Sequence, residues 1–242
     1  MVFSIRKLTL ATATVLLVPL PLLGAETPAP SGHWKGAIHV PSGDVQVAVD
    51  LAFDDGGKLA GTFSNPAEHI NGFPLWNASV DGRSVSLEIK IGGSAVQTFA
   101  GNLSADGQSM SGDFLVNVYA VPFNLTRTGE ARIEAPPRSP AIDEILAGEW
   151  SASLNVGDQS LPVALTLSNH ADGTAMGSWA SGGGSASPVA IAHQGRSVTL
   201  TSTVTTAAYS GTVNADGTEI SGTFSEGSLE QPMTFTRIAG TR

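Results

Sequence analysis

The sequence predicts an all-β protein built from two tandem eight-stranded antiparallel up-and-down barrels, joined by a linker with one short helix. Two observations predict this fold. A set of landmark residues occurs twice in the same order along the chain. Between the landmarks, apolar and polar residues alternate, and glycine- or proline-bearing turns recur about every ten residues. Because a period of two is the pattern of a half-buried strand, each copy is expected to fold as a series of hairpins.

The landmarks define the two copies. Gly32-His33-Trp34 opens the first copy, and Gly148-Glu149-Trp150 opens the second. The motifs Gly-Arg-Ser-Val, Ala-Asp-Gly and Ser-Gly-x-Phe follow in the same order in both, and Arg127 and Arg237 end the last strands. We therefore expect one barrel over residues 32–128, a linker over 129–147 and a second barrel over 148–242.

The first 25 residues resemble a secretory signal peptide. Arg6 and Lys7 precede an apolar run that ends at Leu23, and Ala25 offers a small residue for cleavage. A membrane-spanning helix is the alternative, but two prolines interrupt the run, which favours the signal. We expect a periplasmic or secreted protein with no stable membrane insertion after cleavage, and a mobile Pro-rich leader over residues 26–31.

Composition excludes several classes of partner. The chain contains no cysteine, so no disulfide can hold the fold. Its formal net charge is −9, and removal of the signal peptide makes the chain more negative still. An acidic chain lacks the basic surface that nucleic acid or an anionic membrane requires, so neither is expected as a partner.

Strict alternation locates the strands of the first copy. The row from Val45 to Phe53 places valine, leucine and phenylalanine on one face, and Val85 to Ile91 repeats the pattern. A closed meander removes the exposed strand edges, whereas a two-sheet sandwich, the alternative, needs longer connections. The eight strands are expected near residues 34–40, 45–53, 58–64, 73–80, 84–91, 95–103, 109–116 and 119–127.

The linker has two parts. Residues 130–137 are polar and proline-bearing, as in a spacer. Ser139 can cap a helix, Pro140 suits its first turn, and Ile142, Ile145 and Leu146 have helical spacing. We expect one short helix here, packed against the base of the second barrel.

The two copies differ in one loop. The second copy has the glycine loop Ser181–Ser185 where the first has the richer segment Asn65–Leu75. A glycine loop offers few side chains for recognition, so the first copy is the better candidate for a binding site. An eight-stranded barrel is wide enough to be filled by side chains or to hold one small ligand, and for repeats this short we expect the former.

Gly-x-Trp on the first strand with arginine on the last resembles the signature of lipocalins and related barrels. The resemblance implies that Trp34 pairs with Arg127 and Trp150 with Arg237, each pair closing one barrel end. Each whole copy also looks like a lipocalin-like barrel module of exported bacterial proteins, which often precedes a serine α/β-hydrolase domain. The matching residues include Lys58–Ser64 and Val121–Arg127. No hydrolase domain follows Arg237 in this sequence, so the catalytic machinery is not carried over.

Motifs for chemistry are missing from the sequence. It contains no Gly-x-Ser-x-Gly elbow, no His-Glu-x-x-His and no phosphate-binding glycine loop, and its histidines lack metal-ligand spacing. We expect no cofactor and no metal. His69, Phe73 and Trp76, near the mouth of the first barrel, are the candidate contacts for a ligand or partner. Their structural alternatives are a solvated loop histidine and two aromatic residues that cover the rim of the core.

These observations favour an exported, non-enzymatic binding or accessory protein of the cell envelope. Its two lipocalin-like barrels would contact a protein partner or hold a small apolar ligand. The alternative is a hydrolase-type enzyme with an unrecognised site in the first copy, using His69 and Glu68.

Overall fold

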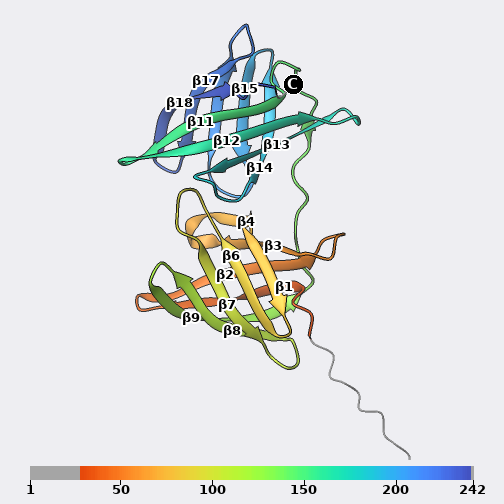
Figure 1. The fold of residues 1–242 in the computed structure, drawn as a ribbon, viewed down its shortest axis with the longest axis vertical. Coiled ribbons are helices and arrows are strands. Elements are labelled where there is room, and N and C mark those ends of the chain that lie inside the picture. The colour runs from red at the N-terminus through yellow and green to blue at the C-terminus, as the bar shows by residue number, and fades with distance from the viewer. Residues whose placement is uncertain (1–27, 241–242) are drawn as a thin grey trace, which may run out of the picture.

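The computed structural model describes residues 28–240 and confirms an all-β protein. Two nine-stranded antiparallel sheets lie one above the other in Figure 1, and the segment that joins them runs along one side. The predicted signal peptide, residues 1–25, lies outside the described residues, as do residues 26 and 27 of the predicted leader.

The first sheet follows the order β4-β3-β2-β1-β9-β8-β7-β6-β5. Its strands begin and end within a few residues of the predicted bounds, except that the strand expected at 73–80 is two strands separated by a bend. The bounds are β1 (Gly32–Val40), β2 (Gly43–Phe53), β3 (Leu59–Asn65), β4 (Ile70–Pro74), β5 (Asn77–Asp81), β6 (Ser84–Ile89), β7 (Gln97–Leu103), β8 (Ser109–Val116) and β9 (Tyr119–Gly129).

This first sheet is curled but not closed, so the prediction of two closed barrels was wrong for the first copy. Strand β4 pairs with β3 and ends at Pro74, which has no N–H to continue a ladder. Leu75 N still donates to Gly61 O of β3 at 2.9 Å, and the chain changes partner at the next residue, where Trp76 N donates to Glu88 O of β6 at 2.7 Å. Strand β5 continues only along β6. The bend replaces a continuous strand that would have joined β3 to β6.

The second sheet contains a closed eight-stranded barrel. Strands β13, β12, β11, β18, β17, β16, β15 and β14 follow one another, and β13 pairs again with β14 through Gly177–Val189 and its neighbours. The bounds are β10 (Ser139–Pro140), β11 (Gly148–Val156), β12 (Gln159–Asn169), β13 (Thr174–Ser181), β14 (Ser187–Gln194), β15 (Ser197–Ser202), β16 (Ala208–Val213), β17 (Glu219–Glu226) and β18 (Leu229–Arg237). The short strand β10 adds a ninth member beside β13.

The linker forms no helix in the structure, contrary to the prediction. Its main chain is engaged by side chains and turns of the second sheet. Ile142 N donates to Asn169 Oδ1 at 2.9 Å, and Asn169 Nδ2 donates back to Ile142 O at 2.8 Å. Leu146 N donates to Asp143 O, which makes one tight turn. The apolar residues that suggested a helical face, Ile142 and Leu146, are buried in the second core from this extended segment and its turn.

Aromatic side chains fill both interiors. In the first sheet the ring of Phe99 lies 4.6 Å from that of Phe114 and 5.0 Å from that of Phe123, between centroids. In the second, Tyr209 packs edge-on against Phe235 and donates its hydroxyl hydrogen toward Ile220 O at 2.9 Å. These inward rows are the apolar members of the alternating segments, and each forms one continuous cluster.

Trp34 and Arg127 meet at one end of the first sheet. The Arg127 guanidinium carbon lies 4.6 Å from the centre of the fully buried Trp34 ring. The guanidinium also donates to the carbonyls of Gly107, Ser31 and Ala29, and Trp34 Nε1 donates to Pro30 O at 2.8 Å. The described part of the leader, residues 28–31, is therefore hydrogen-bonded to the sheet, contrary to the expectation that it is mobile.

The second sheet repeats this arrangement with Trp150 and Arg237. The guanidinium carbon lies 4.0 Å from the ring centre, and Trp150 Nε1 donates to Leu146 O at 3.0 Å. Arg237 donates to the carbonyls of Gly217, Ala147 and Ile145. In both sheets the arginine thus joins the Ala-Asp-Gly turn to the chain just before Gly-x-Trp, which explains in physical terms why those two landmarks recur together.

Candidate functional site

The three predicted contact residues do not converge on one cavity. His69 follows the short 3-10 turn η1 (Pro66–Glu68), has φ 55° and is exposed. Phe73 is buried in the first core. Trp76 is 47% exposed and has Lys90 Nζ 5.1 Å from its ring centre. Glu68, the other residue of the alternative enzyme site, is exposed on the same turn as His69.

A wide cleft lies between the two sheets, outside both cores. Its volume is about 1020 Å³. The outer face of β1 to β4 forms one wall, β12, β13 and β14 form the other, and the linker borders it. The main lining residues are His33, Lys35, Ala48, Asp50, Thr62, Ser64, Asn71, Arg132, Ile133, Glu134, Thr166, Ser168, His170, Met176, Ser178, Thr203 and Val204.

Strand alternation explains why these residues face the cleft. On β1, Trp34 points inward to the core, so its neighbours His33 and Lys35 point outward. The same alternation puts Ala48 and Asp50 of β2 on the outer face, opposite Lys35 and His33 in the register. On the second sheet Thr166 and Ser168 face outward, in alternation with the buried Leu165 and Leu167. The cleft is therefore enclosed by two outer sheet faces.

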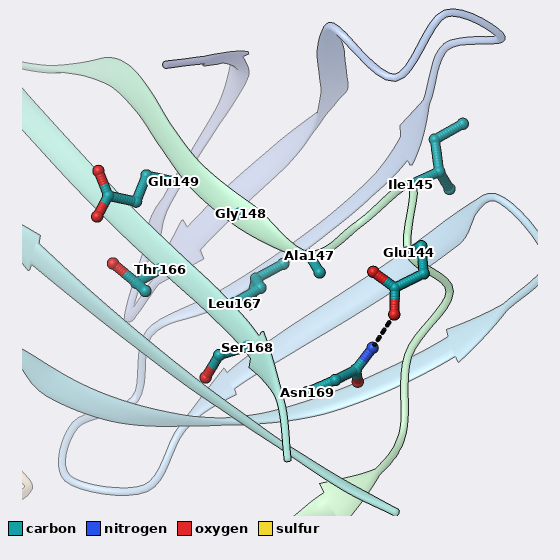
Figure 2. Close-up of a pocket in the computed structure, with 9 residues that line it drawn as sticks. All are labelled: Glu144, Ile145, Ala147, Gly148, Glu149, Thr166, Leu167, Ser168 and Asn169. Carbon is teal, nitrogen blue, oxygen red and sulfur yellow. Dashed lines mark hydrogen bonds between the residues drawn. The ribbon is translucent and has the colours of Figure 1, made fainter. Parts of the chain in front are cut away.

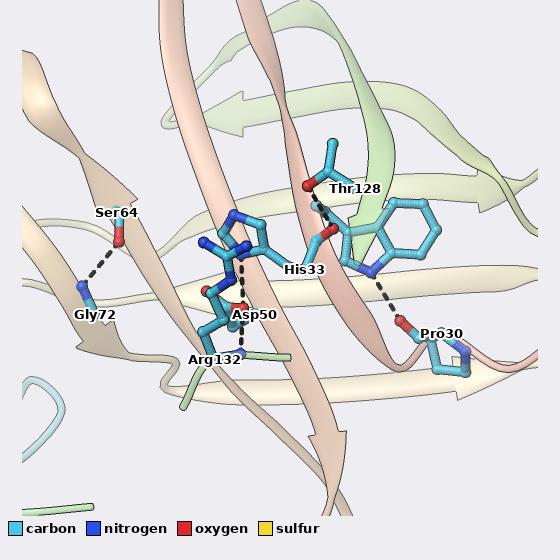
Figure 3. A network of polar contacts seen from close by, with 8 residues as sticks. Pro30, His33, Asp50, Ser64, Gly72, Thr128 and Arg132 are labelled. Carbon is cyan, nitrogen blue, oxygen red and sulfur yellow. Dashed lines mark hydrogen bonds and ion pairs between the residues drawn. The ribbon is translucent and has the colours of Figure 1, made fainter. Parts of the chain in front are cut away.

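A buried His–Asp pair lies in the first wall (Figure 3). His33 Nδ1 lies 2.7 Å from Asp50 Oδ1, and each side chain is 8% exposed. The same carboxylate oxygen accepts the main-chain N–H of Arg132 at 2.7 Å. A carboxylate can only accept, so Nδ1 carries the proton of the imidazole. Asp50 therefore fixes both the histidine ring and the start of the linker.

The second nitrogen of this histidine has no hydrogen-bond partner among the described residues. His33 Nε2 is buried, and no protein group lies within bonding distance. A buried polar atom without a partner costs about 1–3 kcal/mol. With Nδ1 held by Asp50, Nε2 is the ring nitrogen whose hydrogen-bonding capacity no described residue uses.

Direct contacts hold the two walls of the cleft together. Val204, in the loop between β15 and β16, is 6% exposed and belongs to the core cluster of the first sheet. Its carbonyl accepts from Asn71 N at 2.9 Å, and Ser185 N donates to Lys90 O at 3.1 Å. Because both sheets contribute buried and hydrogen-bonded groups to this interface, the cleft is a defined space rather than an accidental gap.

A second pocket, of about 640 Å³, lies between the linker turn and β12 (Figure 2). Asn169 crosses toward Glu144 there, with Nδ2 3.3 Å from Glu144 Oε1, in addition to its two bonds to Ile142. Since these bonds hold the linker to the barrel, the polar groups of this pocket have a structural role.

Two further classes of site are absent from residues 28–240. Within residues 28–240, no three histidine, aspartate or glutamate side chains gather closely enough to hold a metal ion. Across the same residues, no helix has the length and apolarity needed to cross a bilayer.

Sequence reasoning missed His33, Asp50 and Arg132. The available signal was the outward row of the strands: Asp50 lies between Ala48 and Ala52, which are small residues where a solvated face would carry longer polar ones. A small-residue face beside a histidine indicates a surface that something else covers. Which part of the chain covers it depends on the docking of the sheets, which no local pattern encodes.

Comparison with known proteins identifies no family. No family model matches the sequence, and no curated protein matches it. Among solved structures, a candidate outer membrane protein from Bacteroides fragilis is 14% identical, with a TM-score of 0.26, over 86% of this chain and 97% of that one. A protein of unknown function from the DUF3598 family of Nostoc punctiforme is 13% identical, with a TM-score of 0.26, over 86% of this chain and 96% of that one. At this level of similarity neither supports an argument about this chain.

Proposed function

We propose that this chain is an exported, non-enzymatic binding protein of the bacterial cell envelope and that it holds its ligand or partner in the cleft between the two sheets. The cleft of about 1020 Å³ between two docked walls is the observation that carries the proposal. A space of this size is typical of sites for small molecules. The filled cores argue against a carrier that holds its ligand inside a barrel.

Export and family membership belong to the same proposal. The N-terminal basic residues and apolar run support export. The two Trp–Arg pairs support a lipocalin-like module that has been duplicated. The hydrolase alternative receives no such support, because His69 is exposed on a surface turn and lies outside the lining of the cleft.

Native mass spectrometry tests the proposal on protein purified without detergent from the envelope of its own host. We expect a reproducible extra mass that is lost on denaturation, or a partner captured by cross-linking. Ala48→Trp would fill the cleft from an outward position and abolish the bound mass. Ala164→Trp is the matched control, because Ala164 is exposed on β12 away from the cleft lining. Absence of both a bound mass and a partner would contradict the proposal.

A further inference from the structure

We propose that the cleft binds a small amphiphilic anion, whose carboxylate or phosphate head group lies against His33, Arg132 and Lys35. This inference rests on the proposed function and specifies the class of ligand. It begins from the unpartnered Nε2 of His33, a buried polar atom in a residue that lines the cleft. A ligand oxygen is the simplest group that would give this nitrogen a hydrogen-bond partner.

Two cationic residues lie beside the His–Asp pair. Lys35 is two residues along β1 on the same face, a separation of about 7 Å along the strand. Arg132 is joined to the His–Asp pair through its main chain, at 2.7 Å from Asp50 Oδ1. Both side chains are exposed, line the cleft and have no ion-pair partner within residues 28–240.

The charge of the whole chain makes this placement informative. The sequence has 12 lysine and arginine residues against 21 acidic ones. Two cations without an ion-pair partner beside one buried histidine are therefore not what the average charge of the chain would place there. Asp50, Glu134 and His170 are the other titratable groups in the lining. Asp50 accepts the hydrogen bonds of His33 and Arg132 and keeps its charge, so the attraction for an anion comes from the exposed Lys35 and Arg132 side chains.

The remaining walls suit an apolar tail. Ile133 is 42% exposed beside Arg132, and the half-buried Met176 lines the opposite side. An alkyl chain that covers these side chains removes apolar surface from water while the head group stays at the charged end. The combination of a cationic end and an apolar wall selects an amphiphilic anion over a purely apolar molecule or a free inorganic ion.

Isothermal titration of the mature protein with five probes tests this inference: octanoate, octyl phosphate, octanol, octylammonium and inorganic phosphate. We expect the two amphiphilic anions to bind at least tenfold more tightly than the other three. Arg132→Gln and Lys35→Gln should each weaken octanoate binding about tenfold, because each removes a charged contact. Arg138→Gln, an exposed linker arginine that lies outside the cleft lining, should leave it unchanged.

His33→Gln is the most direct variant, but it can also disturb the buried pair, so Arg132→Gln and Lys35→Gln, which change exposed side chains, keep the test decisive. Equal affinity for octanol and octanoate would overturn the inference, as would tighter binding of inorganic phosphate than of octyl phosphate. The inference would also be overturned if His33→Gln, Arg132→Gln and Lys35→Gln each bound octanoate with the affinity of the wild type. Nε2 would then have a buried water as its only hydrogen-bond partner. If the purified protein carries a bound mass but binds none of the probes, the assignment of an amphiphilic anion is wrong and the proposed function still stands. Absence of a bound mass and of a cross-linked partner would instead defeat the proposed function itself.

Discussion

The side chain of Asp50 accepts the main-chain N–H of Arg132 at 2.7 Å, although 82 residues separate them in the sequence. The same oxygen holds His33, so one buried carboxylate connects strand β1, strand β2 and the linker. This connection fixes where the linker leaves the first sheet and therefore where it borders the cleft.

The Asp50 connection gives a first prediction. Asp50→Ala leaves two buried or half-buried N–H groups without an acceptor, so the free energy of unfolding should fall by about 2–4 kcal/mol in urea denaturation. Asp44→Ala is the matched control, because Asp44 holds His39 at the same 2.7 Å on the exposed surface. That variant should show little change. Equal effects of the two variants would show that the buried pair has no special structural role.

The exposed pair gives a prediction about pH. The hydrogen bond that Asp44 accepts from His39, followed by that with Asn124, raises the pKa of His39 above its ordinary value of 6.5. Since the folded-state pKa is the higher one, this pair stabilises the fold below about pH 6.5 and loses its effect as pH rises through the folded-state pKa. NMR titration should show the raised pKa, and Asp44→Asn should lower it. An unchanged pKa in the variant would contradict the assignment of Asp44 as its main cause.

The Trp–Arg pairs give a third prediction. Arg127→Lys keeps the charge but cannot reach the carbonyls of Gly107, Ser31 and Ala29 together. The free energy of unfolding should fall by about 2–3 kcal/mol, and the chain around residues 28–31 should become sensitive to limited proteolysis. Arg138→Lys, at an exposed ion pair with Asp172, should change neither property measurably. A protease-resistant Arg127→Lys variant would refute the role of the guanidinium in fixing this segment.

The interface between the sheets gives a fourth prediction. Val204→Asp places a carboxylate in the core of the first sheet, so the two sheets should separate. Small-angle X-ray scattering should then report a larger radius of gyration. Val156→Asp, at a position 47% exposed on the second sheet, should leave the scattering curve unchanged. An unchanged curve for Val204→Asp would mean that other contacts hold the sheets together.

Local alternation was enough to locate the strands. The row Val45–Phe53 falls within β2, and the row Val85–Ile91 overlaps β6, which ends at Ile89, because alternate side chains of a half-buried strand point inward and outward. That the first sheet stays open was not predictable in this way. It depends on Pro74 and on the change of hydrogen-bond partner between Leu75 and Trp76, which is decided by the neighbouring strands.

The linker and the cleft show the same limit. Ser139, Pro140 and Ile142 have the local pattern of a helix start, but Asn169 offers the main chain of Ile142 hydrogen bonds in an extended conformation. Tertiary partners of this kind override a weak helical preference. His33 and Asp50 likewise lie 17 residues apart, and only the antiparallel register of β1 and β2 makes them neighbours.

The bond from Asn71 N to Val204 O has a consequence for folding in the order of synthesis. Strand β4 is the outer edge of an open sheet, and an unpaired edge is a template for aggregation. Val204 accepts a hydrogen bond from that edge at Asn71, but it is made long after residues 32–129. Until then the first half exposes a strand edge with unpaired main-chain groups to other protein molecules. The second half therefore protects part of this edge, and we expect a first half expressed alone to self-associate.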